Sequence, residues 1–388
     1  MFRFRVACEI GTCPPTTREE GDIAMSGLKF RADMDEVRAR LSSWWEGGDI
    51  GRPAMQIYAR REEPLEAVPD VPKPEGWTTH YSTKDFGYRV HLARKACIST
   101  HYLAEAVPSV SPDLAPNCLA LFLGCPGVEG EGTVWCDPVI PRDSGGAPAE
   151  YDFACDESNF YWDFCRRLGQ EQLELGRDKF LVEFPDLIEG LDTLAAMRGT
   201  EELLSDLLER PDWVQACLRR ISDLYFEYYD RLYDMLRDEV GGSIFWAWAP
   251  GRMSKFQCDI SAMISPPMFG EFMVPVLTEM CERVDWCMYH WDGPGALPHL
   301  DHLLSIDALD MIQWTPGAAD EPTHNPRWWP YYHRIVDAGK TVLLLSCGGR
   351  YGIGALKREF GDQFKRFMLR ARARSPREAE ELMKLAEV

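Results

Sequence analysis

An alternation of short apolar segments with helical segments constrains the fold of this 388-residue chain more than any other feature. It begins at about residue 33 and continues to the carboxyl end. The strand-like segments are apolar on both faces, which is typical of parallel strands covered by helices. About seven or eight such units in one chain favour a closed barrel. No GxGxxG turn follows the first expected strand, which argues against a dinucleotide-binding fold. We therefore predict an α/β fold, a single-domain (β/α)8 TIM barrel.

The expected elements follow from this alternation. The expected strands cover 53–58, 180–184, 243–248, 286–290, 309–314 and 341–347, with an extended segment over 107–113. The expected helices cover 33–45, 86–103, 160–176, 211–238, 265–284, 297–305 and 328–338, with a further helix capped by Thr200. Beyond residue 347 we expect only helix, including an amphipathic surface helix over 371–385. Residues 1–32 are expected to be an irregular extension, with Met25 as an alternative start, and 33–388 to be the barrel.

Composition excludes several classes of function. The formal net charge is −20, from 42 basic and 62 acidic residues, so a nucleic-acid partner would meet repulsion. No apolar run is long enough to predict a membrane-spanning helix. The 13 cysteines are scattered and form no CxxC motif, which indicates buried thiols in a reducing compartment. We expect a cytoplasmic protein without membrane or nucleic-acid partners.

Polar and aromatic residues recur at the carboxyl ends of the expected strands, where (β/α)8 barrels place their working residues. Large flat side chains there would suit a flat or quaternary-ammonium ligand, with core packing as the equal alternative. The candidate substrate-binding residues are Tyr58, Arg60, Asp186, Trp246, Trp248, Gln313 and Trp314. The candidate catalytic residues are Asp113, His290 and Asp292.

The segment YHWDGPG at 289–295 is the richest of these strand ends. In a strand, residues i and i+2 point the same way, so His290 and Asp292 could face one pocket. Cys347 ends another expected strand. Together with His290, and with Asp292 or Glu183, it could bind zinc and leave one position open. Alternatively, Asp292 is an ordinary turn residue, and Cys347 is a buried thiol that binds no metal.

Four segments in order resemble the uroporphyrinogen decarboxylase superfamily, and more closely its decarboxylase-like branch beside the corrinoid methyltransferases. They are PDLIEGLD at 185–192, DISAMISP at 259–266, YHWDGPG at 289–295 and IQWTPG at 312–317. The resemblance runs from about residue 33 to the carboxyl end and implies a (β/α)8 barrel.

The resemblance implies one of two chemistries. True decarboxylases of this superfamily use no cofactor; they bind substrate carboxylates through an arginine-rich amino-terminal segment and hold the pyrrole nitrogens with an aspartate. Here Arg60 and Arg61 lie in that region without the rest of the motif, and Asp113 could match the aspartate. The methyltransferases bind zinc through His-x-Cys and a distant Cys. His290 and Cys347 match two of those positions, and Asp292 replaces the third.

Three hypotheses follow. The first is a corrinoid-linked methyltransferase that moves a methyl group between a small methylated substrate and a corrinoid protein. In it His290 acts as acid, base or zinc ligand and Asp292 orients it. The second is a cofactor-free decarboxylase, which predicts convergence of arginines; the candidates are Arg60, Arg61, Arg252 and Arg350. The third is a non-catalytic small-molecule-binding barrel.

Overall fold

A seven-stranded sheet forms most of the barrel wall in the computed structural model, which describes residues 27–141, 153–317 and 320–388. Its strand order is β2-β1-β13-β12-β11-β10-β9, and each neighbouring pair is parallel except β1 and β2. The strands are β1 (Ala54–Arg60), β2 (Thr100–Ala104), β9 (Met253–Gln257), β10 (Trp286–Asp292), β11 (Met311–Thr315), β12 (Thr341–Leu344) and β13 (Phe367–Ala373).

Short strands complete the wall between β1 and β9. They are β3 (Ser109–Val110), β6 (Leu181–Val182), β7 (Ser243–Phe245) and β8 (Ala247–Ala249). β3 pairs in parallel with β6, and β7 folds back on β8. A backbone hydrogen bond joins the two pairs: Phe184 N, just after β6, donates to Ile244 O of β7 (2.9 Å). Glu105 N, just after β2, donates to Met55 O of β1 (2.7 Å). The result is the single-domain, barrel-like α/β fold that the alternation predicts.

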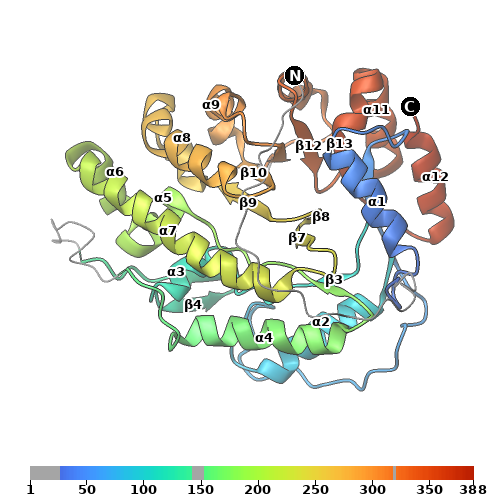
Figure 1. Cartoon of the computed structure of the whole chain (residues 1–388), viewed down its shortest axis with the longest axis horizontal. Coiled ribbons are helices and arrows are strands. Elements are labelled where there is room, and N and C mark those ends of the chain that lie inside the picture. Colours follow the sequence, from blue (N-terminus) through green and yellow to red (C-terminus); the bar gives the residue numbers. More distant parts are fainter. Residues whose placement is uncertain (1–26, 142–152, 318–319) are drawn as a thin grey trace, which may run out of the picture.

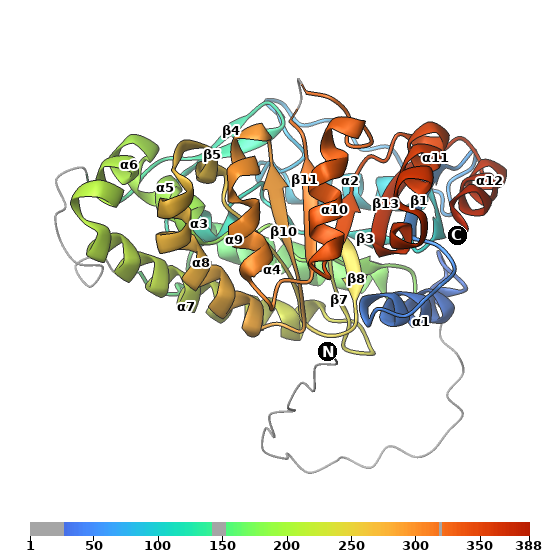
Figure 2. The same ribbon diagram turned by 90° about the horizontal axis from the view of Figure 1, so that it is seen from above.

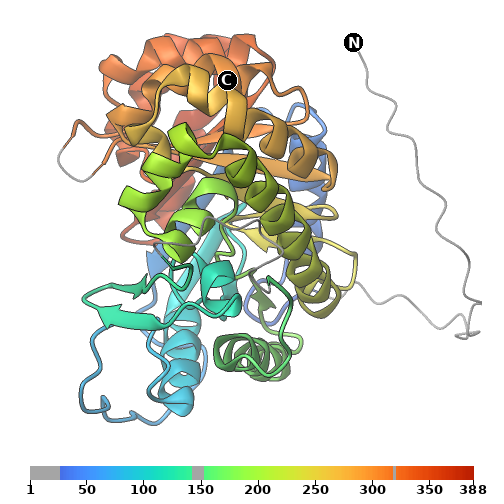
Figure 3. The same ribbon diagram turned by 90° about the vertical axis from the view of Figure 1, so that its left-hand side faces the viewer.

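Helices cover the outside of the strands. Figures 1 and 2 show α7 to α12 following one another around strands β9 to β13. The helices are α1 (Met34–Trp45), α2 (Phe86–Ile98), α3 (Cys118–Phe122), α4 (Phe160–Gly176), α5 (Gly190–Arg198), α6 (Thr200–Glu209), α7 (Pro211–Leu236), α8 (Pro266–Glu282), α9 (Leu300–Ser305), α10 (Trp329–Asp337), α11 (Gly349–Phe360) and α12 (Pro376–Ala386). A hairpin of β4 (Gly127–Gly130) and β5 (Thr133–Cys136) projects from the body, as Figure 3 shows. None of the helices in the described ranges has both the length and the apolar character needed to cross a bilayer.

The amino-terminal end of the barrel is a closed apolar floor. Met253, Met288, Met311 and Met368, from four neighbouring or nearby strands, are fully buried there. α1 packs its tryptophans against the same cluster, and the Trp45 indole N–H donates to the carbonyl of Trp248 at 2.9 Å. The opposite, carboxyl end is therefore the only strand end left to form an open mouth among the described residues.

The expected helix over 86–103 is wrong in its last five residues. α2 ends at Ile98, and β2 begins at Thr100 and pairs antiparallel with β1. A run with β-branched and aromatic residues, such as Thr100 and Tyr102, fits a pleated surface better than a helix. Tertiary pairing thus overrides the continuous apolar pattern.

The expectation of helix throughout the carboxyl-terminal segment is also wrong. β13 lies between α11 and α12 and closes the sheet by pairing with both β1 and β12. Its side chains alternate: Leu369 and Ala371 join the main core, whereas Arg370 and Arg372 line a cavity inside the barrel. This period of two is the strand signal that the arginine-rich composition obscured. The surface helix begins only at Pro376.

The expected strand over 243–248 is broken. Trp246 has a positive φ of 56°, and the chain reverses there from β7 into β8 before entering β9, which the sequence reasoning missed. Thr200 is the first residue of α6 and forms no side-chain cap; Gly199 precedes it. The predicted extension over 1–32 and the alternative start at Met25 lie outside the described residues, except for 27–32, so that boundary stays a prediction.

Candidate metal centre at the barrel mouth

A hollow of about 470 Å3 opens at the carboxyl ends of the strands, and we call it the acidic hollow. Its lining contains five carboxylates and, among the described residues, no arginine or lysine. Aromatic rings and small side chains supply the rest of the wall. The lining comprises Tyr81, Ser111, Asp113, Pro116, Glu183, Phe184, Asp186, Phe245, Trp246, Gln257, Asp259, His290, Asp292, Thr315 and Leu345. A cation in this hollow would be stabilised by the carboxylates.

Three of these residues form a group that could hold a metal ion. Asp259 lies two residues beyond the end of β9, and His290 and Asp292 end β10 on one face of the strand. One ligand atom from each lies within 4.8 Å of the others. The Nε2 atom of His290 is 3.9 Å from Oδ2 of Asp292. Oδ1 of Asp292 is buried and has no hydrogen-bond partner among the described residues.

The tautomer of His290 follows from its neighbour on β11. Gln313 lies opposite His290 in the strand register, and its Nε2 donates to the Thr315 hydroxyl at 2.9 Å. Its Oε1 therefore faces the His290 Nδ1 and accepts a hydrogen bond from it. Burial, and next the charge of Lys255, lower the pKa of His290, so the ring is neutral. The Nε2 lone pair then points at the two carboxylates, as in a metal-ligating histidine oriented by a second partner.

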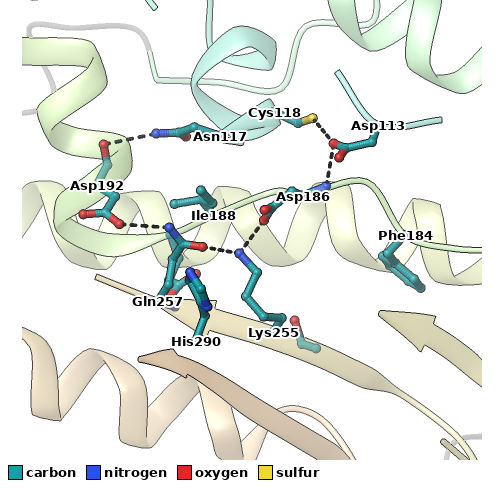
Figure 4. A network of polar contacts seen from close by, with 12 residues as sticks. Asp113, Asn117, Cys118, Phe184, Asp186, Ile188, Asp192, Lys255, Gln257 and His290 are labelled. Atoms are coloured by element: carbon teal, nitrogen blue, oxygen red, sulfur yellow. Dashed lines mark hydrogen bonds and ion pairs between the residues drawn. The ribbon is translucent and has the colours of Figure 1, made fainter. Parts of the chain in front are cut away.

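A buried lysine, Lys255, connects polar side chains at the base of the acidic hollow (Figure 4). The Lys255 side chain is fully buried; its ammonium donates to Asp186 Oδ1 at 2.5 Å and to the amide oxygen of Gln257. The Gln257 amide nitrogen is then directed at Oδ2 of Asp259 (3.1 Å). Loss of hydration, and then the charges of Asp192 and Asp292, raise the pKa of Asp259 to about 7. A bound cation would relieve that repulsion.

A second pair of carboxyl groups, Asp113 and Asp186, lines the same hollow. Oδ1 of Asp113 accepts hydrogen bonds from the Asp186 backbone N–H (3.0 Å) and the Cys118 thiol (3.4 Å). Burial, and next the charge of Asp186, raise the pKa of Asp113 to about 7. Near neutral pH this carboxyl group is therefore protonated in part of the molecules, which suits a proton donor.

A larger neighbouring hollow of about 760 Å3 contains Arg370 and Arg372, and we call it the basic hollow. It shares Ser111, Glu183, Trp246 and Leu345 with the acidic hollow, so the two are joined. Trp246 stands at the junction, with its ring 5.4 Å from that of His290 in an edge-to-face arrangement. The other lining residues are Tyr58, Ala93, Ala96, Cys97, Thr100, Tyr102, Ser109, Val110, Cys347, Gly348, Gly349 and Ala371.

The structure brings together most of the predicted strand-end residues. Asp113, Glu183, Asp186, Trp246, His290 and Asp292 line the acidic hollow, and Gln313 supports His290 from behind. Tyr58 and Cys347 line the basic hollow instead. Burial raises the pKa of the Cys347 thiol to about 11. In the described part of the chain the only metal-ligand group includes Asp259 and not Cys347.

Other predicted residues lie apart from both hollows. Trp248 sits at the apolar floor, where its indole N–H donates to Asp238 at 2.8 Å, because the reversal at Trp246 turns it toward the opposite end. Trp314 packs among the rings of Trp291 and Trp328.

The arginines named for a decarboxylase also do not converge. Arg60 and Arg61 line a separate surface hollow, Arg252 pairs with Asp230, and Arg350 pairs with Glu381.

Sequence reasoning missed Asp259, Lys255 and Gln257 as site residues. Their signal was a short alternating segment, MSKFQ, with an aspartate two residues beyond its end. From sequence alone, a lysine in a strand that also contains Met253 and Phe256 is expected to face solvent. Here Lys255 faces the interior of the barrel.

Comparison with solved structures finds a similar fold in a methyltransferase from Methanosarcina mazei, with a TM-score of 0.54. The alignment covers 90% of this chain and 98% of that chain, at 11% sequence identity. No protein-family model matches the chain. No curated protein matches its sequence. The structural likeness shows a shared fold over nearly the whole of both chains.

Proposed function

We propose that this protein is a methyltransferase that moves a methyl group between a small methylated substrate and a corrinoid protein. We further propose that it works with a divalent metal ion held by Asp259, His290 and Asp292. The observation that carries this proposal is the convergence of an imidazole lone pair and two carboxylates at the mouth of the barrel. The fold shared with a methyltransferase supports the reaction type.

Zinc is the metal we expect, because nitrogen and carboxylate oxygen ligands suit it and three protein ligands leave a position for substrate. When bound, it would act as a Lewis acid toward the heteroatom that carries the methyl group. Gln313 and Gln257 would hold His290 and Asp259 in place through the hydrogen bonds described above. Asp259 thus takes the place that the resemblance gave to Cys347 as the third ligand.

The protein's own groups would then support the transfer. The carbon–heteroatom bond breaks, the heteroatom keeps the bonding electrons and takes up a proton, and the methyl group passes to the corrinoid of the partner. Asp113 is placed to supply that proton. The Lys255 ammonium donates to Asp186 Oδ1 and so fixes this second carboxyl group in position beside Asp113.

The decarboxylase hypothesis is less well supported. A substrate with many carboxylates would meet five carboxylates in the acidic hollow. The four arginines predicted for it lie on separate parts of the surface, and the adjoining basic hollow contributes two others, Arg370 and Arg372. A non-catalytic binding barrel is the remaining alternative, and it predicts binding without any turnover.

Metal analysis joined to a transfer assay tests the proposal. We expect about one zinc per chain after incubation with zinc and dialysis, lost in Asp259→Asn and kept in Cys347→Ser. Methanol, dimethyl sulfide and trimethylamine would each be mixed with the protein and reduced cobalamin, and methylation of cobalt followed by visible absorption. A protein that takes up no metal and methylates no cobalamin would contradict the proposal.

A further inference from the structure

The basic hollow carries charge opposite to that of its neighbour. Arg370 and Arg372 lie two residues apart on β13, so both side chains are on the same face of the strand. Both line the basic hollow, the half-buried Arg370 within it and the exposed Arg372 toward solvent. They face Gln56 and Tyr58 across the parallel register with β1. Two arginines against the single carboxylate of Glu183 give this hollow a positive excess, although the whole chain has a net charge of −20.

Neither arginine is neutralised by a carboxylate. Among the described residues, no acidic group lies within ion-pair distance of Arg370 or Arg372. Arg370 is instead fixed by neutral acceptors: its Nε donates to Gln56 Oε1 (2.9 Å) and one terminal nitrogen to the Trp246 carbonyl (2.8 Å). Its guanidinium lies 5.7 Å from the centre of the Tyr58 ring. A fixed, uncompensated guanidinium in a cavity is suited to bind an oxoanion.

The junction between the hollows defines how a ligand would lie. Glu183 and Trp246 belong to both linings, and the acidic hollow beyond them would repel an anionic group. Gly348 and Gly349, at the start of α11, also line the basic hollow, and a helix amino terminus favours negative charge. A molecule with an anionic end is therefore held in one orientation.

From this division of charge we propose that the basic hollow binds the carboxylate of an organic acid whose other end carries the methyl group. Arg370 and Arg372 hold the carboxylate, and the methyl-bearing end passes Trp246 toward Asp259, His290 and Asp292. The carboxylate site stands on the two arginines alone. The identity of the other end rests on the proposed methyl transfer.

A matched pair of ligands tests the carboxylate site. 4-Methoxybenzoate and 4-methoxybenzamide have nearly the same shape and differ in charge, and their affinities for the full chain would be measured by isothermal titration calorimetry. We expect the acid to bind roughly ten- to a hundredfold more tightly, the range of a charge-assisted hydrogen bond. Arg372→Gln and Arg370→Gln should each reduce that ratio, and the exposed Arg358→Gln on α11 should leave it unchanged.

Arg372 forms no hydrogen bond within the described residues that its replacement would remove, and the acid-to-amide ratio is unaffected by partial unfolding. Equal binding of acid and amide, or a ratio that survives both substitutions, would overturn the proposal. The transfer assay separates this failure from that of the function. Methyl transfer from uncharged donors alone would refute the acid and leave the methyltransferase standing. Binding that depends on the arginines, without methyl transfer from any donor, would support the carboxylate site and refute the methyltransferase.

Discussion

The two ends of the barrel are built on opposite principles. At the floor, methionines from β9, β10, β11 and β13 are fully buried beneath α1, and polar groups such as the Trp45 indole have partners. At the mouth, carboxylates crowd together, and Oδ1 of Asp292 and Oε2 of Glu189 are buried without hydrogen-bond partners among the described residues. Burial also raises the pKa of Glu189 well above its usual value.

The contrast is sharpest along β10, where Met288 belongs to the floor and His290 and Asp292 belong to the mouth. All three lie on the same face of the strand because they are spaced by two. One strand therefore contributes stability at one end and unsatisfied ligand atoms at the other, as expected when strand carboxyl ends carry function. Substitutions along this face should separate the two properties.

The largest effect is expected at the mouth. His290→Ala should abolish methyl transfer and weaken zinc binding more than about a hundredfold, because even a residue that only hydrogen-bonds to a metal ligand contributes about 10- to 100-fold. The thermal midpoint without metal should hardly change. Zinc titration and calorimetric melting would measure both, with His302→Ala on α9 as the control. Full zinc affinity in His290→Ala would show that the mouth is not a metal site.

The floor should respond in the opposite way. Met288→Ala removes a fully buried side chain, so we expect a loss of about 2–5 kcal/mol in the free energy of unfolding. The folded variant should still bind one zinc per chain. Urea denaturation and metal analysis would test this. A Met288→Ala variant that kept its stability but lost its metal would contradict the claim that the floor contributes stability and the mouth binds the metal.

A smaller effect is expected at Gln313, which contacts the metal ligand His290 but would not bind the metal itself. Gln313→Leu removes the acceptor for the His290 Nδ1–H and should reduce zinc affinity about 10- to 100-fold. Gln313→Glu keeps an acceptor there and should retain most of the affinity. Competition with a chelating dye would measure both variants. Equal affinities in both would mean that Gln313 does not orient the ring.

Counted per pH unit, the smallest effect is the pH dependence of stability at Asp113. Its pKa is raised to about 7 in the folded protein, from an ordinary 3.8, so the folded state binds a proton that the unfolded state has released. The stabilising contribution is thus complete below about pH 4 and is lost as the pH rises toward 7. The slope is at most about 1.4 kcal/mol per pH unit, since one proton is involved.

Asp113→Asn keeps an oxygen acceptor and should remove this slope, whereas Asp212→Asn, at an exposed position of α7, should not. Urea denaturation at a series of pH values would compare the three proteins. Parallel curves for wild type and Asp113→Asn would show that Asp113 titrates normally.

The barrel and half of the site could be predicted from local sequence. Helix–strand alternation is a local pattern, and His290-x-Asp292 lies at the end of a clear apolar strand. Asp259 could not be placed in the same way, because its approach to His290 depends on the parallel register of β9 and β10. Trp248 was misplaced since one positive φ at Trp246 reverses the chain. Such a reversal has no strong signal in residue types alone.

β13 shows a different limit. Its arginines suggested a solvated helix, yet Arg370 and Arg372 face a cavity whose walls come from segments as distant as Tyr58 and Glu183. The alternation along the segment is a strand signal, but an arginine's surroundings depend on tertiary structure, so the basic hollow could not be inferred from the segment itself.

Cobalt substitution tests the central claim of a nitrogen and oxygen metal site at the mouth most directly. Cobalt(II) bound by Asp259, His290 and Asp292 should give visible d–d absorption without a thiolate-to-metal charge-transfer band. The spectrum should be unchanged in Cys347→Ser and absent in Asp259→Asn. A charge-transfer band that disappears in Cys347→Ser, or a protein that binds no cobalt, would contradict the account.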